Sequence, residues 1–139
     1  MRQFCDENDI LLIADEVQSG FGRTGEYFAI NGHFDVVPDI LVMAKGIANG
    51  YPISGIASRR ELMDRQPPGA MGGTYAGNAV ACAAAVATQE AIEKENVLAN
   101  VSDRSIQILN FLNALRSSGR YPILVRSILS ISNLLYKSV

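Results

Sequence analysis

Several residue types on which common catalytic sites depend are scarce in this 139-residue sequence. It contains one histidine, His33, so a catalytic triad or a histidine-rich metal site would have to be built on that residue alone. We expect His33 to be an ordinary turn or surface histidine. The two cysteines, Cys5 and Cys82, form neither a C-x-x-C motif nor a metal-ligand spacing. They are expected to be buried, reduced thiols of an intracellular protein.

An excess of charge of one sign is also lacking. The sequence has 12 basic and 14 acidic residues, mixed along the chain, and a net charge of −2. It therefore lacks the basic stripe of a nucleic-acid-binding protein and the basic amphipathic stretch of a membrane-surface protein. The apolar run near the C-terminus is short and interrupted by Arg126 and several serines, which argues against a membrane anchor. We expect neither nucleic acid nor a membrane as a partner.

What the sequence does contain is a globular composition, 48% hydrophobic, and a pattern of strands, loops and helices. Residues 10–14 and 40–44 are short apolar runs that predict strands buried on both faces, and residues 53–57 could form a third strand. The alanine-rich residues 78–100 favour a helix. Ser102 is expected to cap a second helix that Gly119 ends. The pattern predicts an α/β fold, mostly parallel sheet with flanking helices.

Two of the predicted strands end at residues that suit catalysis. Asp15 follows the first strand and Lys45 follows the second. In an open parallel sheet, ligands bind beyond the carboxyl ends of the strands. A carboxylate there can pair with a cationic ring nitrogen, and a partly desolvated lysine is a usable nucleophile. These are the two groups that a pyridoxal 5'-phosphate (PLP) enzyme requires of its protein.

A glycine-rich segment, residues 72–78, precedes the alanine-rich helix. Glycines allow close approach of the backbone, and the free N–H groups of a helix start attract an anion, to which Thr74 adds a hydroxyl donor. Spacing alone fits an anion site and a simple helix cap equally well. Residues 20–25 match the G-x-G-x-x-G dinucleotide fingerprint, but Gly20 comes late after the strand and a poor helix follows. A nicotinamide-dependent oxidoreductase is therefore a weaker alternative.

Three segments of the chain resemble the class-III aminotransferases, most closely the 4-aminobutyrate aminotransferase branch. They occur in family-like order between about residues 10 and 101: residues 14–25 (ADEVQSGFGRTG), residues 38–53 (PDIL through AKG to GYPI), and residues 72–85 (GGTYAGNAVACAAA). The resemblance implies part of the large domain of a fold-type-I PLP-dependent transferase. It also implies a homodimer with active sites at the subunit interface, an amino donor such as 4-aminobutyrate, and a keto acid acceptor such as 2-oxoglutarate.

The resemblance also implies roles for individual residues. Asp15 would hold the pyridine nitrogen of PLP, Val17 would pack against the ring, and Gln18 would reach the ring's phenolic oxygen. Lys45 would carry the Schiff base with the cofactor and shuttle the proton between substrate carbon and cofactor. Thr74 would bind the cofactor phosphate across the dimer interface.

The family pattern does not cover the whole chain evenly. We expect residues 1–101 to be part of the PLP-binding large domain, residues 102–121 a helix leading towards the small domain, and residues 122–139 a divergent tail. The family's N-terminal third is missing, so the native N-terminus is expected to be missing too, and the site of action is expected to be the cytoplasm or the mitochondrion. The alternatives are an inactive truncated fragment, or another fold-type-I PLP enzyme such as an aminomutase or a decarboxylase.

Overall fold

The centre of the fold is a three-stranded sheet. The structure is a computed structural model, and it describes residues 1–70 and 72–119. The strands lie in the order β1 (Ile13–Asp15), β2 (Ile40–Met43) and β3 (Gly55–Ser58). The predicted strands are all present, shifted by one to three residues at their starts or ends, as short strands often are. The α/β class is confirmed.

The sheet is mixed, whereas the sequence predicts a mostly parallel one. Strands β1 and β2 are parallel, with Asp15 opposite Val42, but β3 runs antiparallel to β2, with Gly55 opposite Met43. A parallel connection needs a crossover of a dozen or more residues, usually with a helix. Residues 44–54 hold only the single 3-10 turn η1 (Lys45–Ala48), so the chain turns back and pairs antiparallel.

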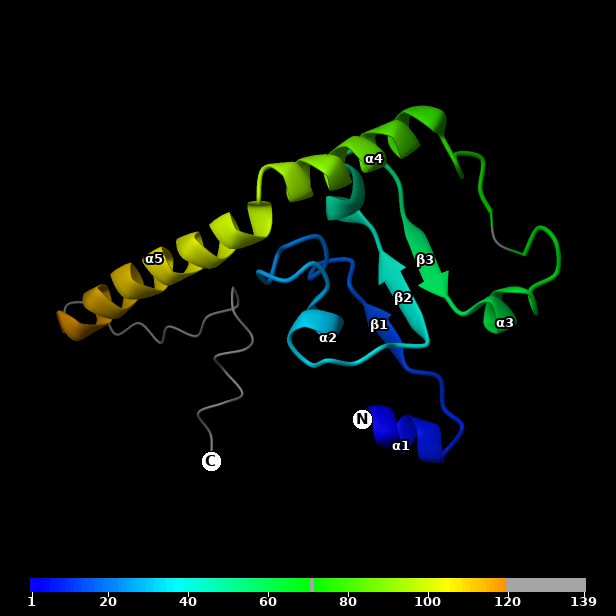
Figure 1. The fold of residues 1–139 in the computed structure, drawn as a ribbon, viewed down its shortest axis with the longest axis horizontal. Helices are drawn as coiled ribbons and strands as arrows, with labels where there is room; N and C mark the ends of the chain where they lie inside the picture. Colours follow the sequence, from blue (N-terminus) through cyan, green and yellow to red (C-terminus); the bar gives the residue numbers. More distant parts are fainter. Residues whose placement is uncertain (71, 120–139) are drawn as a thin grey trace.

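The longer helices lie beyond one end of the sheet. Helix α4 (Ala79–Lys94) packs on η1 at the end towards which β2 runs, and α5 (Val97–Ser117) continues from it as a long arm (Figure 1). The other helices are short: α1 (Arg2–Glu7) at the opposite end of the sheet, α2 (Ala29–Gly32) between β1 and β2, and α3 (Arg60–Met63) after β3. The carboxyl ends of β1 and β2 therefore lie on the η1 side.

The boundary between α4 and α5 differs from the prediction. Asn78 caps α4 by accepting a hydrogen bond from the Ala81 N–H (3.1 Å). The break falls at Asn96, whose φ of 52° lies in the left-handed region that asparagine tolerates better than most residues. The predicted cap Ser102 is wrong, because Ser102 lies within α5. Gly119 follows the end of α5 with a φ of +67°, as expected.

Burial is sparse in the described residues. Cys5 is buried, as expected, whereas Cys82 is only half-buried, and both are free thiols. The first strand is not buried on both faces as predicted: Ile13 is 57% exposed and Leu11 48%. The reason is that α4 packs on η1 and α5 rather than on the strands. The predicted tail, residues 122–139, and the last two residues of the predicted helix 102–121 lie outside the described residues.

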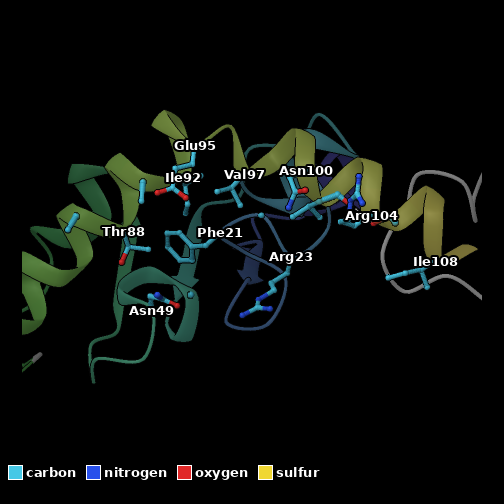
Figure 2. Close-up of a pocket in the computed structure, with 16 residues that line it drawn as sticks. Phe21, Arg23, Asn49, Thr88, Ile92, Glu95, Val97, Asn100, Arg104 and Ile108 are labelled. Atoms are coloured by element: carbon cyan, nitrogen blue, oxygen red, sulfur yellow. Dashed lines mark hydrogen bonds between the residues drawn. The ribbon is translucent and has the colours of Figure 1, made fainter.

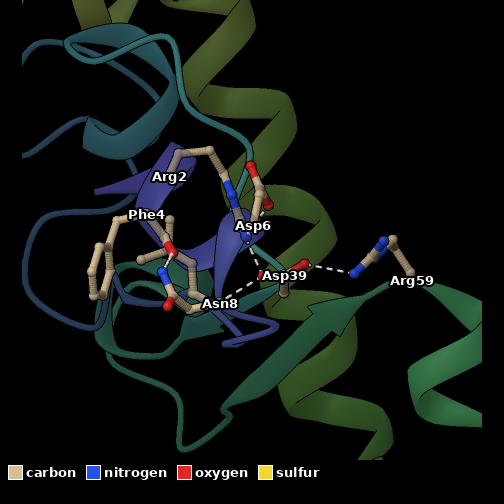
Figure 3. A network of polar contacts seen from close by, with 7 residues as sticks. Arg2, Phe4, Asp6, Asn8, Asp39 and Arg59 are labelled. Carbon is tan, nitrogen blue, oxygen red and sulfur yellow. Dashed lines mark hydrogen bonds and ion pairs between the residues drawn. The ribbon is translucent and has the colours of Figure 1, made fainter.

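A buried carboxylate joins three segments at the end of the sheet away from η1. Asp39, just before β2, accepts hydrogen bonds from the Leu12 N–H (2.8 Å), from Arg2 Nη1 (2.7 Å) and from Arg59 Nη2 (2.6 Å) (Figure 3). The Leu12 N–H and the Arg2 guanidinium hold the pKa of the Asp39 carboxyl below its usual range. We call this set the Asp39 clamp. It ties α1 and the start of α3 to the sheet.

Candidate active site

Asp15 presents an oriented carboxylate at the end of β1. It is the last residue of the strand, and its side chain is exposed. The Val17 N–H donates a hydrogen bond to Asp15 Oδ1 (3.1 Å), which fixes the carboxylate against the turn that follows. That turn, residues 17–20, carries the half-buried Val17 and the exposed Gln18. Three of the predicted site residues thus lie in one short segment.

Lys45 lies in a strained conformation just after β2. Its φ is +46°, in a region that few non-glycine residues occupy, and such outliers are common at functional sites. The 3-10 turn that Lys45 begins is held against α4, because Gln89 Nε2 donates to the Ile47 carbonyl (2.9 Å). The backbone that carries Lys45 is therefore supported, while its side chain is exposed.

The sheet register places Asp15 and Lys45 at the same edge. Asp15 lies opposite Val42 in the parallel β1–β2 pair, and Lys45 follows β2 by two residues. This is the carboxyl edge of the two strands, where open α/β sheets bind ligands. The placement agrees with the sequence expectation, and the chemical roles of the two residues remain predictions.

Thr74 lies apart from this pair. It is exposed in the loop before α4 and lines a cavity of about 760 Å³ together with residues 52–56. Lys45 lines an adjoining cavity of about 560 Å³, and the two cavities share Pro52 and Ile53. The structure does not bring Thr74 into the Lys45 cavity. A role of Thr74 in the partner subunit's site remains a prediction.

Sequence reasoning missed the buried carboxylate next to Asp15. Glu16 is 2% exposed; its Oε1 accepts from the Ile30 N–H (2.6 Å), and its Oε2 accepts from the Ser19 hydroxyl. Glu16 therefore closes the turn that carries Val17 and Gln18 and ties it to α2. Strand alternation was the available signal, because adjacent side chains point to opposite faces.

The glycine loop, residues 20–25, is a packed structural turn. A Cβ at Gly20 would lie 2.8 Å from the Glu16 carbonyl oxygen, so only glycine fits there. The ring of Phe21 makes edge contacts with Tyr27 and Phe28 (5.7 and 5.3 Å between centroids). The four-residue α2 follows this loop, not the long helix that a dinucleotide fingerprint opens. The geometry thus opposes the oxidoreductase alternative.

The glycine loop also borders a groove. A cavity of about 680 Å³ lies between this loop, the 3-10 turn and helices α4 and α5, with Phe21 and Arg23 on one side and Val97, Asn100 and Arg104 on the other (Figure 2). Its chemistry differs from that of the Lys45 cavity because most of its lining is apolar.

None of the helices in residues 1–70 and 72–119 has the length and hydropathy of a membrane-spanning segment.

Sequence relatives of the chain are aminotransferases. A probable 4-aminobutyrate aminotransferase of Bacillus subtilis is 52% identical over 68% of this chain and 21% of its own length. The 4-aminobutyrate aminotransferase GabT of Escherichia coli is 50% identical over 74% of this chain and 24% of its own length. The chain thus spans less than a quarter of the length of these two curated relatives.

Solved structures and a family-wide comparison agree. A transaminase of the marine bacterium Virgibacillus superposes with a TM-score of 0.78 at 32% identity, over 84% of this chain and 28% of that one. A taurine:2-oxoglutarate aminotransferase of Bifidobacterium kashiwanohense, in complex with PLP and glutamate, superposes with a TM-score of 0.75 at 37% identity. The match covers 84% of this chain and 27% of that one. The sequence model of the family described as Aminotransferase class-III matches residues 1–128. The chain belongs to the class-III aminotransferase family.

Proposed function

We propose that the full-length protein containing this chain is a PLP-dependent aminotransferase. It moves an amino group from an ω-amino acid, such as 4-aminobutyrate, to a keto acid such as 2-oxoglutarate. Family membership supports the reaction class, and relatives named for 4-aminobutyrate and 5-aminovalerate support the donor class. The observation that carries the proposal is the shared sheet edge, at which an oriented carboxylate and a supported lysine follow neighbouring parallel strands.

The residues of this edge fit PLP. Both Asp15 and Lys45 are exposed, so the carboxylate and the amine are open to a ligand. PLP, when bound, supplies the electron sink for the reaction. In our proposal, the Asp15 carboxylate keeps the proton on the pyridine nitrogen, Val17 covers a face of the ring, and Gln18 donates to the phenolic oxygen.

Lys45 has two roles in this proposal. Its Nζ would hold the cofactor, and the same amine would then move a proton at the substrate carbon. A rigid turn beneath Lys45 serves both roles, because proton transfer requires the amine to stay within hydrogen-bond reach of its target. Thr74 contributes to phosphate binding from the opposite subunit of a homodimer, and the enzyme acts inside the cell.

An aminomutase or a decarboxylase of the same fold would use the same two residues, because the lysine and the aspartate do not decide the reaction. Product analysis separates these activities. Only transamination converts 2-oxoglutarate to glutamate in step with loss of the amino donor.

Borohydride reduction of the full-length protein tests the role of Lys45. Reduction traps the covalent link between cofactor and lysine, and peptide mass spectrometry then locates it. We expect the pyridoxyl group on Lys45, and we expect Lys45→Ala to lose both the group and the activity. Lys94→Ala, at the exposed end of α4, is the matched control and should keep both. A pyridoxyl group on any other lysine would overturn the assignment.

A further inference from the structure

Glu16 is a buried carboxylate to which the proposed chemistry assigns no role. It is 2% exposed, and within residues 1–70 and 72–119 it makes no ion pair. A buried charge is costly unless it is paired or well hydrogen-bonded. The Glu16 carboxylate is hydrogen-bonded through both oxygens, to the Ile30 N–H (2.6 Å) and to the Ser19 hydroxyl. Loss of either bond would leave a polar group unpaired, so the carboxylate holds both segments in one arrangement.

The backbone of Glu16 is fixed as firmly as its side chain. Its N–H donates to the Val42 carbonyl (3.0 Å), which extends the pairing of β1 with β2 by one residue. Its carbonyl accepts from the Gly20 N–H (2.9 Å), which closes the turn of residues 17–20. Glu16 is therefore the joint between the sheet edge and this turn, and its side chain ties the joint to α2.

The turn carries the groups proposed to contact the cofactor ring. Its Val17 N–H donates to Asp15 Oδ1 (3.1 Å), and within the described part of the chain the Asp15 carboxylate has no other hydrogen-bond donor. Val17 is half-buried and Gln18 is exposed in the same turn. The directions of all three side chains thus depend on where the turn lies, and that position depends on Glu16.

We propose that Glu16 is a positioning residue, which holds Asp15, Val17 and Gln18 in the one geometry that fits the cofactor ring. This inference rests on the proposed function and adds a residue to it. Glu16 itself faces away from the ligand, so its loss removes no contact with the cofactor. It would instead displace three contacts together, and a displacement of about 1 Å can cost about 100-fold in rate.

Three variants of the full-length enzyme test this role. Glu16→Met keeps the length of the side chain but removes both acceptors. Glu16→Gln can keep both bonds, because its amide oxygen accepts from the Ile30 N–H and its amide nitrogen donates to the Ser19 hydroxyl. Asp39→Asn is the matched control, because it weakens the Asp39 clamp at the opposite end of the sheet and should cost stability without moving the turn.

Visible circular dichroism of the bound cofactor measures its positioning, because PLP is achiral and its signal arises from a fixed orientation in the protein. Glu16→Met should lower this signal per bound cofactor. It should also lower kcat by about 10- to 100-fold while KM for 4-aminobutyrate changes by less than about threefold. Glu16→Gln should restore the dichroism and bring kcat to within about threefold of the unsubstituted enzyme. Asp39→Asn should leave both unchanged.

Hydrogen exchange of the cofactor-free protein provides a measurement that does not depend on activity. The amides of residues 17–20 should exchange faster in Glu16→Met than in Glu16→Gln. Ser19→Ala removes only one of the two bonds, so it should show the same changes to a smaller extent even if Glu16→Met does not fold. Faster exchange with unchanged dichroism and kcat would overturn the proposal, because Glu16 would then stabilise the turn without positioning the cofactor. Failure of the proposed function looks different: the pyridoxyl group then lies away from Lys45, and the role of Glu16 falls with it.

Discussion

Two adjacent carboxylates, Asp15 and Glu16, have opposite environments and opposite uses. Glu16 points into the fold, is 2% exposed, and is bonded through both oxygens to Ser19 and Ile30. Asp15 points outward and receives one hydrogen bond, from the Val17 N–H. Strand alternation produces this division. Asp15 can therefore bind a ligand, while Glu16 keeps the following turn in place.

Replacing Asp15 tests its proposed role at the ring nitrogen. In the full-length enzyme, Asp15→Asn should slow single-turnover transamination by at least about 100-fold, close to 3 kcal/mol of barrier, because a neutral amide cannot hold the ring proton by charge. The cofactor Kd should change much less, since the phosphate contacts remain. Asp64→Asn, an exposed residue after α3, is the control. A rate within about tenfold of the unsubstituted enzyme, roughly 1.4 kcal/mol, would show that Asp15 does not pair with the ring nitrogen.

The sequence was sufficient to predict that Asp15 and Lys45 lie at the carboxyl ends of two strands, because each directly follows an apolar run. It was not sufficient for the glycine loop or Glu16. The glycine loop folds back onto Gly46, a contact between segments far apart in the chain. The role of Glu16 depends on the Ile30 N–H, which only the folded chain brings near.

The Asp39 clamp, which joins α1, the start of β2 and the start of α3, should make the free energy of unfolding depend on pH. The Leu12 N–H and the Arg2 guanidinium lower the pKa of Asp39 in the folded protein, whereas its value in an unfolded chain is about 3.9. A carboxyl with a lowered folded pKa contributes stability that is complete above the unfolded pKa and is lost as the pH falls through the folded value. The clamp should thus stabilise the protein at neutral pH and fail in acid.

Thermal unfolding of the full-length protein checks this prediction. Asp39→Asn should lower the unfolding midpoint at pH 7, and the difference from the unsubstituted protein should shrink below about pH 4. Asp64→Asn should show no such trend. A difference that stays constant from pH 7 to pH 3 would mean that the charge of Asp39 contributes nothing.

Local sequence predicted which segments form strands and helices, but neither the direction of β3 nor the break between α4 and α5. Apolar runs identified all three strands, but the direction of β3 depends on the length of the connection from β2, and the three strands therefore form a mixed sheet. The alanine-rich pattern identified α4. It did not show the break at Asn96, since apolar residues continue on both sides and the left-handed residue interrupts no hydrophobic period.

At the scale of the molecule, the 139-residue chain exposes apolar surface along an edge strand. Ile10, Leu11 and Ile13 are each 48% exposed or more, and β1 is the last strand on its side of the sheet. Such edges pair with other chains. Expressed alone, this chain should associate in a concentration-dependent manner. It should also show no turnover with 4-aminobutyrate and 2-oxoglutarate, since it spans less than a quarter of the length of the two 4-aminobutyrate aminotransferases compared above.

Sedimentation velocity measures that association. Ile13→Lys places a charge on the exposed edge and should shift the distribution towards the monomer, because charged edge residues block strand pairing. Val37→Lys, equally apolar and 75% exposed but outside the strands, should have less effect. A compact monomer at all concentrations, or turnover that depends on Lys45, would contradict the prediction.

The antiparallel pairing of β3 has a consequence for the order of folding. The β2–β3 pair joins residues 43 and 55 across a short loop, whereas the β1–β2 pair must bring residue 13 to residue 40. Short loops close sooner and at lower entropic cost. As the chain leaves the ribosome, β1 and Asp15 emerge before β2, the strand with which β1 pairs. We therefore expect the β2–β3 hairpin around Lys45 to form first, so that β1 pairs with an edge that already carries the lysine.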